Sequence, residues 1–283
     1  MIQLPLVGAF LEAAGVILEK RILKSRLVDY KNYTVYSFLA IVVLMLPALY
    51  FFWDVEGAAL EQKNVLIFVF VILSSVLANL FIFYSLKREK VVEFEPLWLM
   101  QPFFVVVLAF ILFESERDVY AAGLALVAGL SLIVSHIKRH HLQFDRYTVT
   151  ALLGSFFFAV ELVVSRFILE YYSSFSFYFI RCFFIFAVTL AVFRPSFNSI
   201  KTSKMTLMIL ATSLIWVLYR VIVYYGYLNL GIIFTTTIFM FSPVLMFLFA
   251  VIFLNEKPTL RQAISTFLIF ICVVLAVYLS VSR

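Results

Sequence analysis

Charged residues are scarce in this chain: Asp, Glu, Lys and Arg make up only 13% of its 283 residues, whereas hydrophobic residues make up 65%. A soluble domain carries roughly a quarter charged residues, so this composition cannot cover a surface in water. The mean hydropathy of +1.08 agrees with that conclusion. We therefore expect a multi-pass integral protein of the cell membrane, in which the membrane domain is the bulk of the molecule.

Cysteine is nearly absent as well, with Cys182 and Cys272 each inside an apolar run, so a disulfide framework has no support. The sequence also lacks a G-x-S-x-G nucleophile motif, a Walker-type glycine loop and any Cys/His metal spacing. His136 and His140 stand four residues apart, but no H-E-x-x-H motif is present. These absences predict a protein that is neither an enzyme nor a primary pump, with no cofactor and no metal site.

Long apolar runs fill the sequence instead. A membrane-spanning helix needs about 20 largely apolar residues, and cutting the chain at charged or turn-rich breaks gives ten such segments. Their approximate bounds are 2–18, 32–53, 64–86, 91–113, 119–137, 148–169, 175–193, 205–228, 231–254 and 260–281. The sequence therefore predicts an all-α membrane protein of ten transmembrane helices.

Lysine and arginine are unevenly distributed among the connections between these spans. Sixteen of the 22 lie at 20–31, 87–90, 138–146, 194–204 and 257–261, and four lie in the other connections and at the chain ends. Because cytoplasmic loops are enriched in lysine and arginine, this bias predicts that both termini lie outside the cytoplasm. The same bias and the attraction to anionic lipid head groups explain the net charge of +6, so no nucleic-acid partner is expected.

The two halves of the chain resemble each other. At an offset of 141 residues Asn79 aligns with Arg220, and Gln101 aligns with Ser242, each of the latter pair being followed by proline. Repeats of five spans must have opposite orientations in the membrane, because each crosses it an odd number of times. Inverted repeats are a recurrent transporter architecture, with the substrate site near the midplane at their interface.

The residues that follow these alignments resemble the signature of EamA-type members of the drug/metabolite transporter superfamily. The first half carries it at Pro96-Leu97, Gln101-Pro102, Glu114 and Gly123, and the second half repeats it at Ser242-Pro243, Asn255-Glu256 and Ser265. The resemblance implies two inverted five-helix EamA-like repeats, residues 1–141 and 142–283. It further implies a central cavity lined by spans 1, 3, 4, 6, 8 and 9, and transport of small organic solutes by alternating access.

Three charged residues interrupt apolar spans at a common depth. Glu161, Arg181 and Arg220 lie six to eight residues from the external ends of spans six, seven and eight, which places them about 9 to 12 Å below one membrane face. An ionisable group at such depth needs a partner or a wet cavity. We expect a site for an anionic or zwitterionic solute, with arginine as a planar donor to a carboxylate or phosphate. The alternative is a structural ion pair between Glu161 and either arginine.

Glu12 lies on a stripe of small and acidic residues in the first span. The stripe is Gly8, Glu12, Gly15 and Glu19, and span six carries the matching stripe Gly154, Phe158, Glu161 and Ser165. Spacings of three and four place each stripe on one helix face, and small or polar residues mark helix contacts, so both faces should point inward. Desolvation at the midplane disfavours the charged carboxyl, which suits proton coupling; a protonated Glu12 bonded to backbone is the alternative.

Span eight carries aromatic residues that are able to stack on a planar solute or to lie at the interface, among them Trp216 and Tyr224. The candidate substrate-binding or coupling residues are Glu12, Asn79, Gln101, Glu161, Arg181, Trp216, Arg220, Tyr224 and Ser242. Glu93 and Glu95, near the start of span four, indicate an interfacial charge cluster or a cytoplasmic gate. In span five, Ala121, Ala125 and Gly129 favour close helix packing within the chain or in a homodimer.

Together these patterns favour a secondary active transporter that moves a small polar or amphipathic metabolite, with export kept open as the direction. Glu12 or Glu161 would couple transport to protons. One alternative is a divalent-cation permease, which the two arginines disfavour because they would repel the ion. The other is a membrane scaffold protein that transports nothing and packs against partners through span five.

Overall fold

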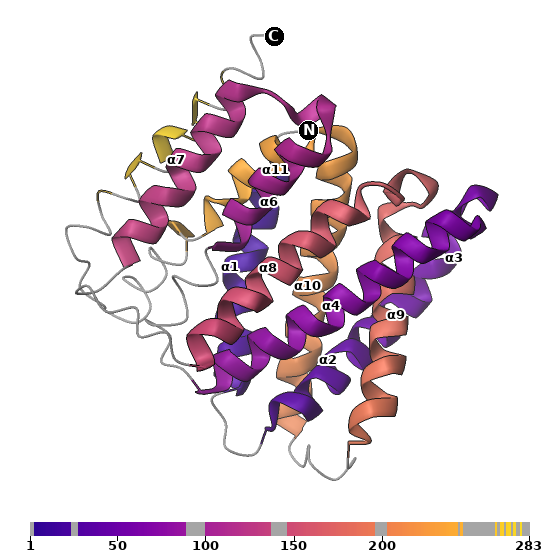
Figure 1. Cartoon of the computed structure of the whole chain (residues 1–283). Coiled ribbons are helices and arrows are strands. Elements are labelled where there is room, and N and C mark those ends of the chain that lie inside the picture. The colour runs from indigo at the N-terminus through magenta and orange to yellow at the C-terminus, as the bar shows by residue number, and fades with distance from the viewer. Residues whose placement is uncertain are drawn as a thin grey trace.

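The computed structural model describes residues 3–23, 28–88, 100–136, 146–195, 203–242 and scattered positions between 244 and 278. These residues form a bundle of helices joined by short 3-10 turns (Figure 1). Lipid offers no hydrogen-bond partners, so apolar segments of this length satisfy their backbone groups by forming helices. The main helices are α1 (Gln3–Leu23), α2 (Tyr30–Met45), α4 (Gln62–Arg88), α6 (Met100–Leu112), α7 (Val119–His136), α8 (Arg146–Ser165), α9 (Ser174–Phe193), α10 (Ser203–Asn229) and α11 (Ile232–Phe239).

Four of the described segments are long and apolar enough to cross a membrane. They are Tyr30–Phe52, Gln62–Ser85, Ser174–Phe193 and Lys204–Asn229. The first of them is α2 extended by the 3-10 turn η1 (Leu46–Ala48) and by α3 (Leu49–Phe52). Pro47 lies in η1, and its missing N–H explains why the helix tightens there. The length and composition of these helices establish an integral membrane protein.

The predicted spans from 2–18 to 205–228 each coincide with a described helix. Within span four, residues 91–99 lie outside the described residues, and α6 is the part that the structure places. Helix α8 ends at Ser165, four residues before the predicted end, because the chain turns there and enters the 3-10 turn η4 (Leu169–Tyr171). Of the last two predicted spans, the structure describes α11 and a few positions beyond it.

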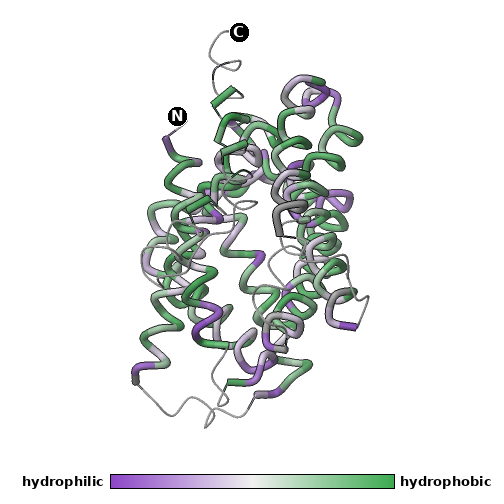
Figure 2. The backbone as a smooth tube through the Cα atoms, turned by 90° about the vertical axis from the view of Figure 1, so that its left-hand side faces the viewer, coloured by the Kyte–Doolittle hydropathy of each residue, from purple (hydrophilic) through white to green (hydrophobic). Residues whose placement is uncertain are grey.

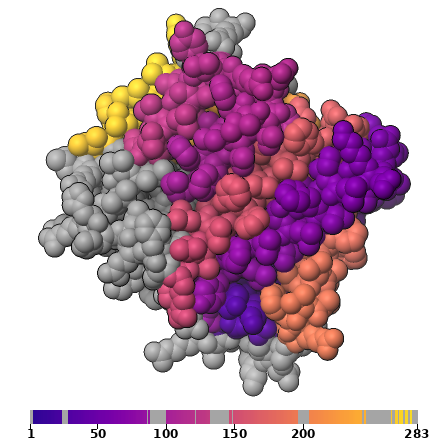
Figure 3. All heavy atoms as spheres, viewed as in Figure 1, coloured from indigo at the N-terminus to yellow at the C-terminus, as the bar shows by residue number. Residues whose placement is uncertain are grey.

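Helix packing brings the two halves of the chain against each other. Helix α4 packs along α8, α1 packs along α10, and α2 packs against α9. Figure 3 shows α4 and α8 in direct contact across the face in view. Figure 2 shows hydrophobic residues along most of each helix, with hydrophilic positions at the ends and at a few internal sites. Those internal polar positions are where a functional site has to be sought.

Glycine permits the closest of these helix contacts. A Cβ atom on Gly154 would lie 2.7 Å from the Ile82 side chain and 3.2 Å from the Ile82 backbone nitrogen. A Cβ atom on Gly8 would clash with the Phe239 ring, with Cζ at 2.8 Å. Both glycines belong to the stripes that the sequence predicts to face inward. The contacts confirm that orientation, because neither position leaves room for a side chain.

Candidate functional site

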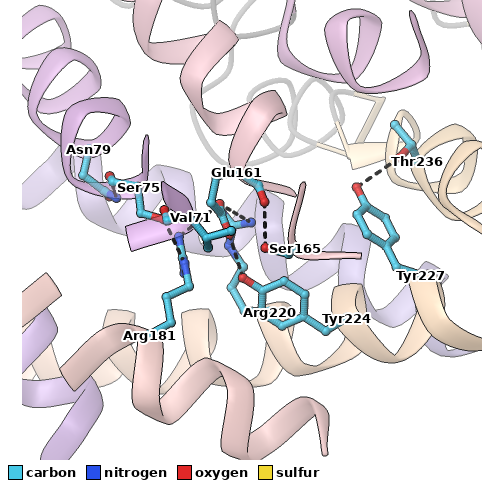
Figure 4. A network of polar contacts seen from close by, with 10 residues as sticks. All are labelled: Val71, Ser75, Asn79, Glu161, Ser165, Arg181, Arg220, Tyr224, Tyr227 and Thr236. Carbon is cyan, nitrogen blue, oxygen red and sulfur yellow. Dashed lines mark hydrogen bonds and ion pairs between the residues drawn. The ribbon is translucent and has the colours of Figure 1, made fainter. Parts of the chain in front are cut away.

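A buried carboxylate, that of Glu161 on α8, lies at the centre of a polar cluster inside the bundle (Figure 4). Its side chain has no exposed surface. The Tyr224 hydroxyl on α10 donates a 2.8 Å hydrogen bond to Oε1. Two guanidinium groups approach Oε2, with Nη2 of Arg181 at 3.0 Å and Nη1 of Arg220 at 3.8 Å. The predicted layer of three charges is therefore a compact ion cluster that joins α8, α9 and α10.

Arg181 on α9 is held on both sides. Besides its ion pair with Glu161, it donates a 3.0 Å hydrogen bond from Nε to Oγ of Ser75 on α4. Ser75 in turn donates to the Val71 carbonyl at 2.8 Å, and the Asn79 amide donates to the Ser75 carbonyl at 2.7 Å (Figure 4). Arg181 is only 2% exposed. The side chain thus connects the second half of the chain to α4 in the first half.

Arg220 on α10 is held more loosely than Arg181. Its guanidinium lies over the rings of Phe158 and Tyr219, with centroid distances of 5.1 Å and 5.7 Å. Among the described residues, its Nη1 atom has no hydrogen-bond partner, although Glu161 lies within ion-pair distance. Oε2 of Glu161 is also buried without a hydrogen-bond partner among the described residues, so the ion pair between Arg220 and Glu161 is not closed by a hydrogen bond.

A cavity adjoins this cluster and is lined by residues of both halves. The lining residues are Glu19 of α1; Ser37, Phe38 and Ile41 of α2; Asn79, Ile82 and Phe83 of α4; Phe158 of α8; Tyr178 and Arg181 of α9; and Trp216 and Arg220 of α10. The empty space between them, including the part open to solvent, is about 520 Å³. Because this figure includes space that is open to solvent, a bound solute would lie partly in the open part of the cavity.

The lining differs from the expectation that spans 1, 3, 4, 6, 8 and 9 surround the cavity. In this cavity, as far as the described residues define it, α2 and α9 take the places of spans four and nine. The physical reason is that α2 packs against both α9 and α10, and that Arg181 reaches inward from α9 to Glu161. A helix that the family resemblance leaves out of the cavity lining thus supplies a charged group to the interior.

Glu12 lies on α1, which packs along α10, but it is not one of the residues that line the cavity. Its carboxyl is buried near the Tyr219 and Ser242 hydroxyls and within the electrostatic reach of Arg220. Ser242 is buried and, among the described residues, its Oγ atom forms no well-aligned hydrogen bond. Gln101 of α6 is buried as well and does not line this cavity. The structure therefore brings Glu12, Ser242 and Arg220 into one neighbourhood and leaves Gln101 elsewhere.

Two contributors to the site, Glu19 and Ser75, are missing from the sequence-based set of candidates. Glu19 lines the cavity and accepts a 2.9 Å hydrogen bond from the Tyr33 hydroxyl of α2. The available signal for Glu19 was its position on the inward stripe of α1, one turn beyond Gly15. Ser75 offered a weaker signal, as a small polar residue inside a long apolar run.

Other predicted features lie at the edge of the described structure. Glu93, Glu95 and His140 are outside the described residues. Within the described residues no group of three His, Cys, Asp or Glu side chains is arranged to hold a metal ion. In α7, Ala125 is fully buried, and a Cβ atom on Gly129 would lie 3.8 Å from Met240 and Phe103. Gly129 thus packs against α6 and the residue that follows α11 in the same chain.

At the end of the bundle away from the basic loops, the two halves are tied together. Val55 forms an antiparallel bridge with Tyr172, and the Ser173 amide donates a 3.0 Å hydrogen bond to the Asp54 carbonyl. The Glu116 carboxylate accepts hydrogen bonds from the first amides of α11, at 2.6 Å and 3.0 Å. A carboxylate at the start of a helix interacts favourably with the helix dipole, and this stabilises the contact between Glu116 and α11.

In the opposite direction, the cavity runs from the two arginines toward the basic loops. Glu19 belongs to the last two turns of α1, Ser37 to the first two or so of α2, and Phe83 to the last two of α4. All three helix ends adjoin connections rich in lysine and arginine. The cavity thus extends from the two arginines toward the end of the bundle that carries the basic loops.

Comparison with known proteins shows which of them share this architecture. Residues 146–278 match the model of the EamA-like transporter family. No curated protein matches the sequence. Among solved structures, 28 chains match; one, titled only "Crystal structure of protein", superimposes with a TM-score of 0.75 over 99% of this chain and 97% of its own. At 17% identity that similarity shows a shared fold. Residues 146–278 therefore match an EamA-like transporter domain, and the long apolar helices indicate an integral membrane protein.

Proposed function

We propose that the protein is a secondary active transporter that carries a small polar or amphipathic metabolite by alternating access. The observation that supports this most is the cavity itself. It is lined by helices from both halves of the chain, and a buried pair of arginines forms part of its wall. A site near the midplane between two halves, accessible from one end, is the arrangement that alternating access requires.

The repeat layout is part of this proposal: residues 1–141 and 142–283 are two inverted five-helix repeats, ten helices in all. A two-fold axis in the membrane plane exchanges the third helix of one repeat with that of the other. In the two repeats the first helices are α1 and α8, and the third helices are α4 and α10. The axis therefore exchanges the contact between α4 and α8 with the contact between α10 and α1, and both contacts are extensive. Gly8 and Gly154, at matching positions of the first and sixth spans, both permit close approach. These paired features support the symmetry.

Access from the cytoplasm follows from the charge distribution. The cavity runs toward the loops that carry most of the lysine and arginine, which the positive-inside rule places in the cytoplasm. The ties at Val55–Tyr172 and at Glu116 lie at the opposite face. Opening outward would require those ties to separate, because they join the two halves.

Proton coupling is assigned to Glu12. Glu161 is already engaged by two guanidinium groups and a tyrosine hydroxyl. The Glu12 carboxyl has hydroxyl neighbours and lies near one guanidinium, at the contact between α1 and α10 that alternating access would rearrange. A carboxyl in such a place is able to exchange a proton as the helices move.

Flux measurements in proteoliposomes test the proposal. Purified protein is reconstituted and loaded with a mixture of labelled metabolites, and uptake and release are followed with and without a pH gradient. Transport of an organic solute that responds to the pH gradient supports a proton-coupled carrier. Flux of a divalent cation would identify a permease instead, and a reconstituted protein that moves neither would be a scaffold.

A further inference from the structure

The connection between α6 and α7 carries a carboxylate that reaches across to the other half of the chain. The connection contains the 3-10 turn η3 (Glu114–Glu116), and Glu116 is the last residue of that turn. Oε1 of Glu116 accepts a 2.6 Å hydrogen bond from the Ile232 amide, and Oε2 accepts one of 3.0 Å from the Ile233 amide. These amides are the first two of α11, so a side chain of the first half holds the start of a helix of the second half.

Gly231, the residue before α11, makes room for this carboxylate. Its φ of +87° lies in the left-handed region that favours glycine, and a Cβ atom there would lie 3.0 Å from Oε1 of Glu116. The same connection makes a second contact between the halves, because the ring of Phe113, just before η3, stacks on that of Phe167 with centroids 4.6 Å apart. The connection and the start of α11 are therefore closely fitted to each other.

Charge distinguishes the Glu116 contact from hydrogen bonds between the halves that lie nearer the basic loops. There, Ser85 donates to the Tyr147 carbonyl at 3.2 Å. Ser213 donates to the Ser37 carbonyl at 3.3 Å. Both of these bonds join neutral groups, whereas a hydrogen bond with an ionised acceptor is roughly twice as strong as a neutral one. A negative charge at a helix start gains further from the helix dipole.

The second half of the chain has no carboxylate at the position that matches Glu116. At the offset of 142 residues that pairs Glu114 with Glu256, Glu116 pairs with Pro258. A proline side chain offers no acceptor, so in an inverted repeat this position cannot supply the equivalent contact at the opposite membrane face. The Glu116 contact therefore acts at one face, and it stabilises the state of the protein in which the two halves meet at that face.

We propose that Glu116 is a one-sided latch that sets the resting orientation of the protein. Its bonds to α11 favour the state in which the cavity faces the basic loops, and they have to break before the cavity opens to the other face. The proposal rests on the proposed alternating access, because it names what regulates access to the same cavity. A contact that exists in one of two states shifts the equilibrium by its full differential free energy, so the outward-open state is rare while the latch is intact.

Thiol accessibility of the cavity tests the latch without knowledge of the solute. In a cysteine-free background, Asn79→Cys places a reporter in the cavity wall, at a position where the native amide is bonded to its own helix. The probe is a membrane-impermeant methanethiosulfonate reagent. It is added to intact cells or to inside-out vesicles, and the rate of modification is measured from each face.

Variants at Glu116 should change the rate from one face. Glu116→Ala should raise the rate from outside the cell about tenfold or more, because it removes two hydrogen bonds to a charged group, and should leave the rate from the cytoplasmic face equal or lower. Glu116→Gln keeps one acceptor oxygen and should give a smaller increase. Glu114→Gln is the matched control and should change neither rate, because the Glu114 side chain is 89% exposed and pairs with Arg117 in the same connection.

Gly231→Ala tests the latch in a protein that retains the carboxylate. Its Cβ atom would crowd Oε1 of Glu116 and weaken the same two bonds, so the rate from outside should rise here as well. An unchanged outside rate in both Glu116→Ala and Gly231→Ala would overturn the proposal. A similar increase from both faces would also overturn it, because it would show that Glu116 only stabilises the fold.

Failure of the latch and failure of the transport proposal give different results. If Glu116→Ala raises the outside rate but reconstituted wild-type protein carries no solute, the latch stands and the transport proposal fails. If the wild-type protein carries a solute and the outside rate is the same in Glu116→Ala, transport stands and the latch fails.

Discussion

The ion cluster around Glu161 predicts unequal coupling between one carboxylate and two arginines. The distances from Oε2 are 3.0 Å to Arg181 and 3.8 Å to Arg220. At an effective dielectric constant of about 20, the two Coulomb attractions are about 5.5 and about 4.4 kcal/mol. The first pair should therefore be stronger by about 1 kcal/mol. Because removing one partner of a buried pair leaves an uncompensated charge, Glu161→Gln alone should cost about 3 to 5 kcal/mol of stability.

Double-mutant cycles measure this difference. Glu161→Gln is combined in turn with Arg181→Gln and with Arg220→Gln, and the free energy of unfolding is measured in mixed micelles of a mild detergent and dodecyl sulfate. The coupling energy for Arg181 should exceed that for Arg220, and Arg181→Gln should lower stability more than Arg220→Gln does. Equal couplings, or a larger coupling for Arg220, would refute the ranking and the argument from distance.

Three further predictions concern coupling, orientation and packing. Glu12→Gln cannot release a proton, so it should abolish uphill transport driven by a pH gradient and leave solute exchange at least partly intact; a mutant that still concentrates solute like the wild type would show that Glu12 is structural. In a cysteine-free background, Gly57→Cys should react with an impermeant thiol reagent from outside the cell and Lys204→Cys should not; the opposite pattern would reverse the topology. Gly154→Ala should cost about 1 to 3 kcal/mol because its Cβ meets a neighbouring helix, whereas Gly123→Ala, with open space around it, should be neutral or stabilising by up to about 1 kcal/mol; similar thermal midpoints for the two variants would contradict the close contact.

Much of the site was accessible from the sequence because depth in a membrane can be counted along a helix. Each residue adds a fixed rise, so the common depth of Glu161, Arg181 and Arg220 follows from their distance to the span ends. The inward faces of α1 and α8 were predictable for a similar reason. Stripes such as Gly8 to Glu19 repeat with helical spacing, and the lipid-facing side of a helix has no use for glycine or glutamate. The structure brings the three charged groups together and places both stripes on buried helix faces.

Sequence patterns could not show which partners these residues meet, because that depends on how helices are rotated and shifted against one another. The hydropathy of α9 gave no indication that Arg181 crosses to Ser75 of the other half, a contact that exists only because α9 and α4 pack side by side. Glu19 illustrates the same limit, since a glutamate beside Lys20 at a helix end also fits an interfacial position, and only the approach of α2 brings Tyr33 to it.

The sequence by itself determined the class of the protein, the approximate positions of its spans and the depth of its charged layer, because these depend on composition and on the fixed rise of a helix. Tertiary structure decided that Glu161 lies closer to Arg181 than to Arg220, and that both arginines line a cavity between the two halves. Those properties arise from differences of less than an ångström between side chains on separate helices. Packing of the whole bundle sets such differences, and no local pattern along the chain contains them.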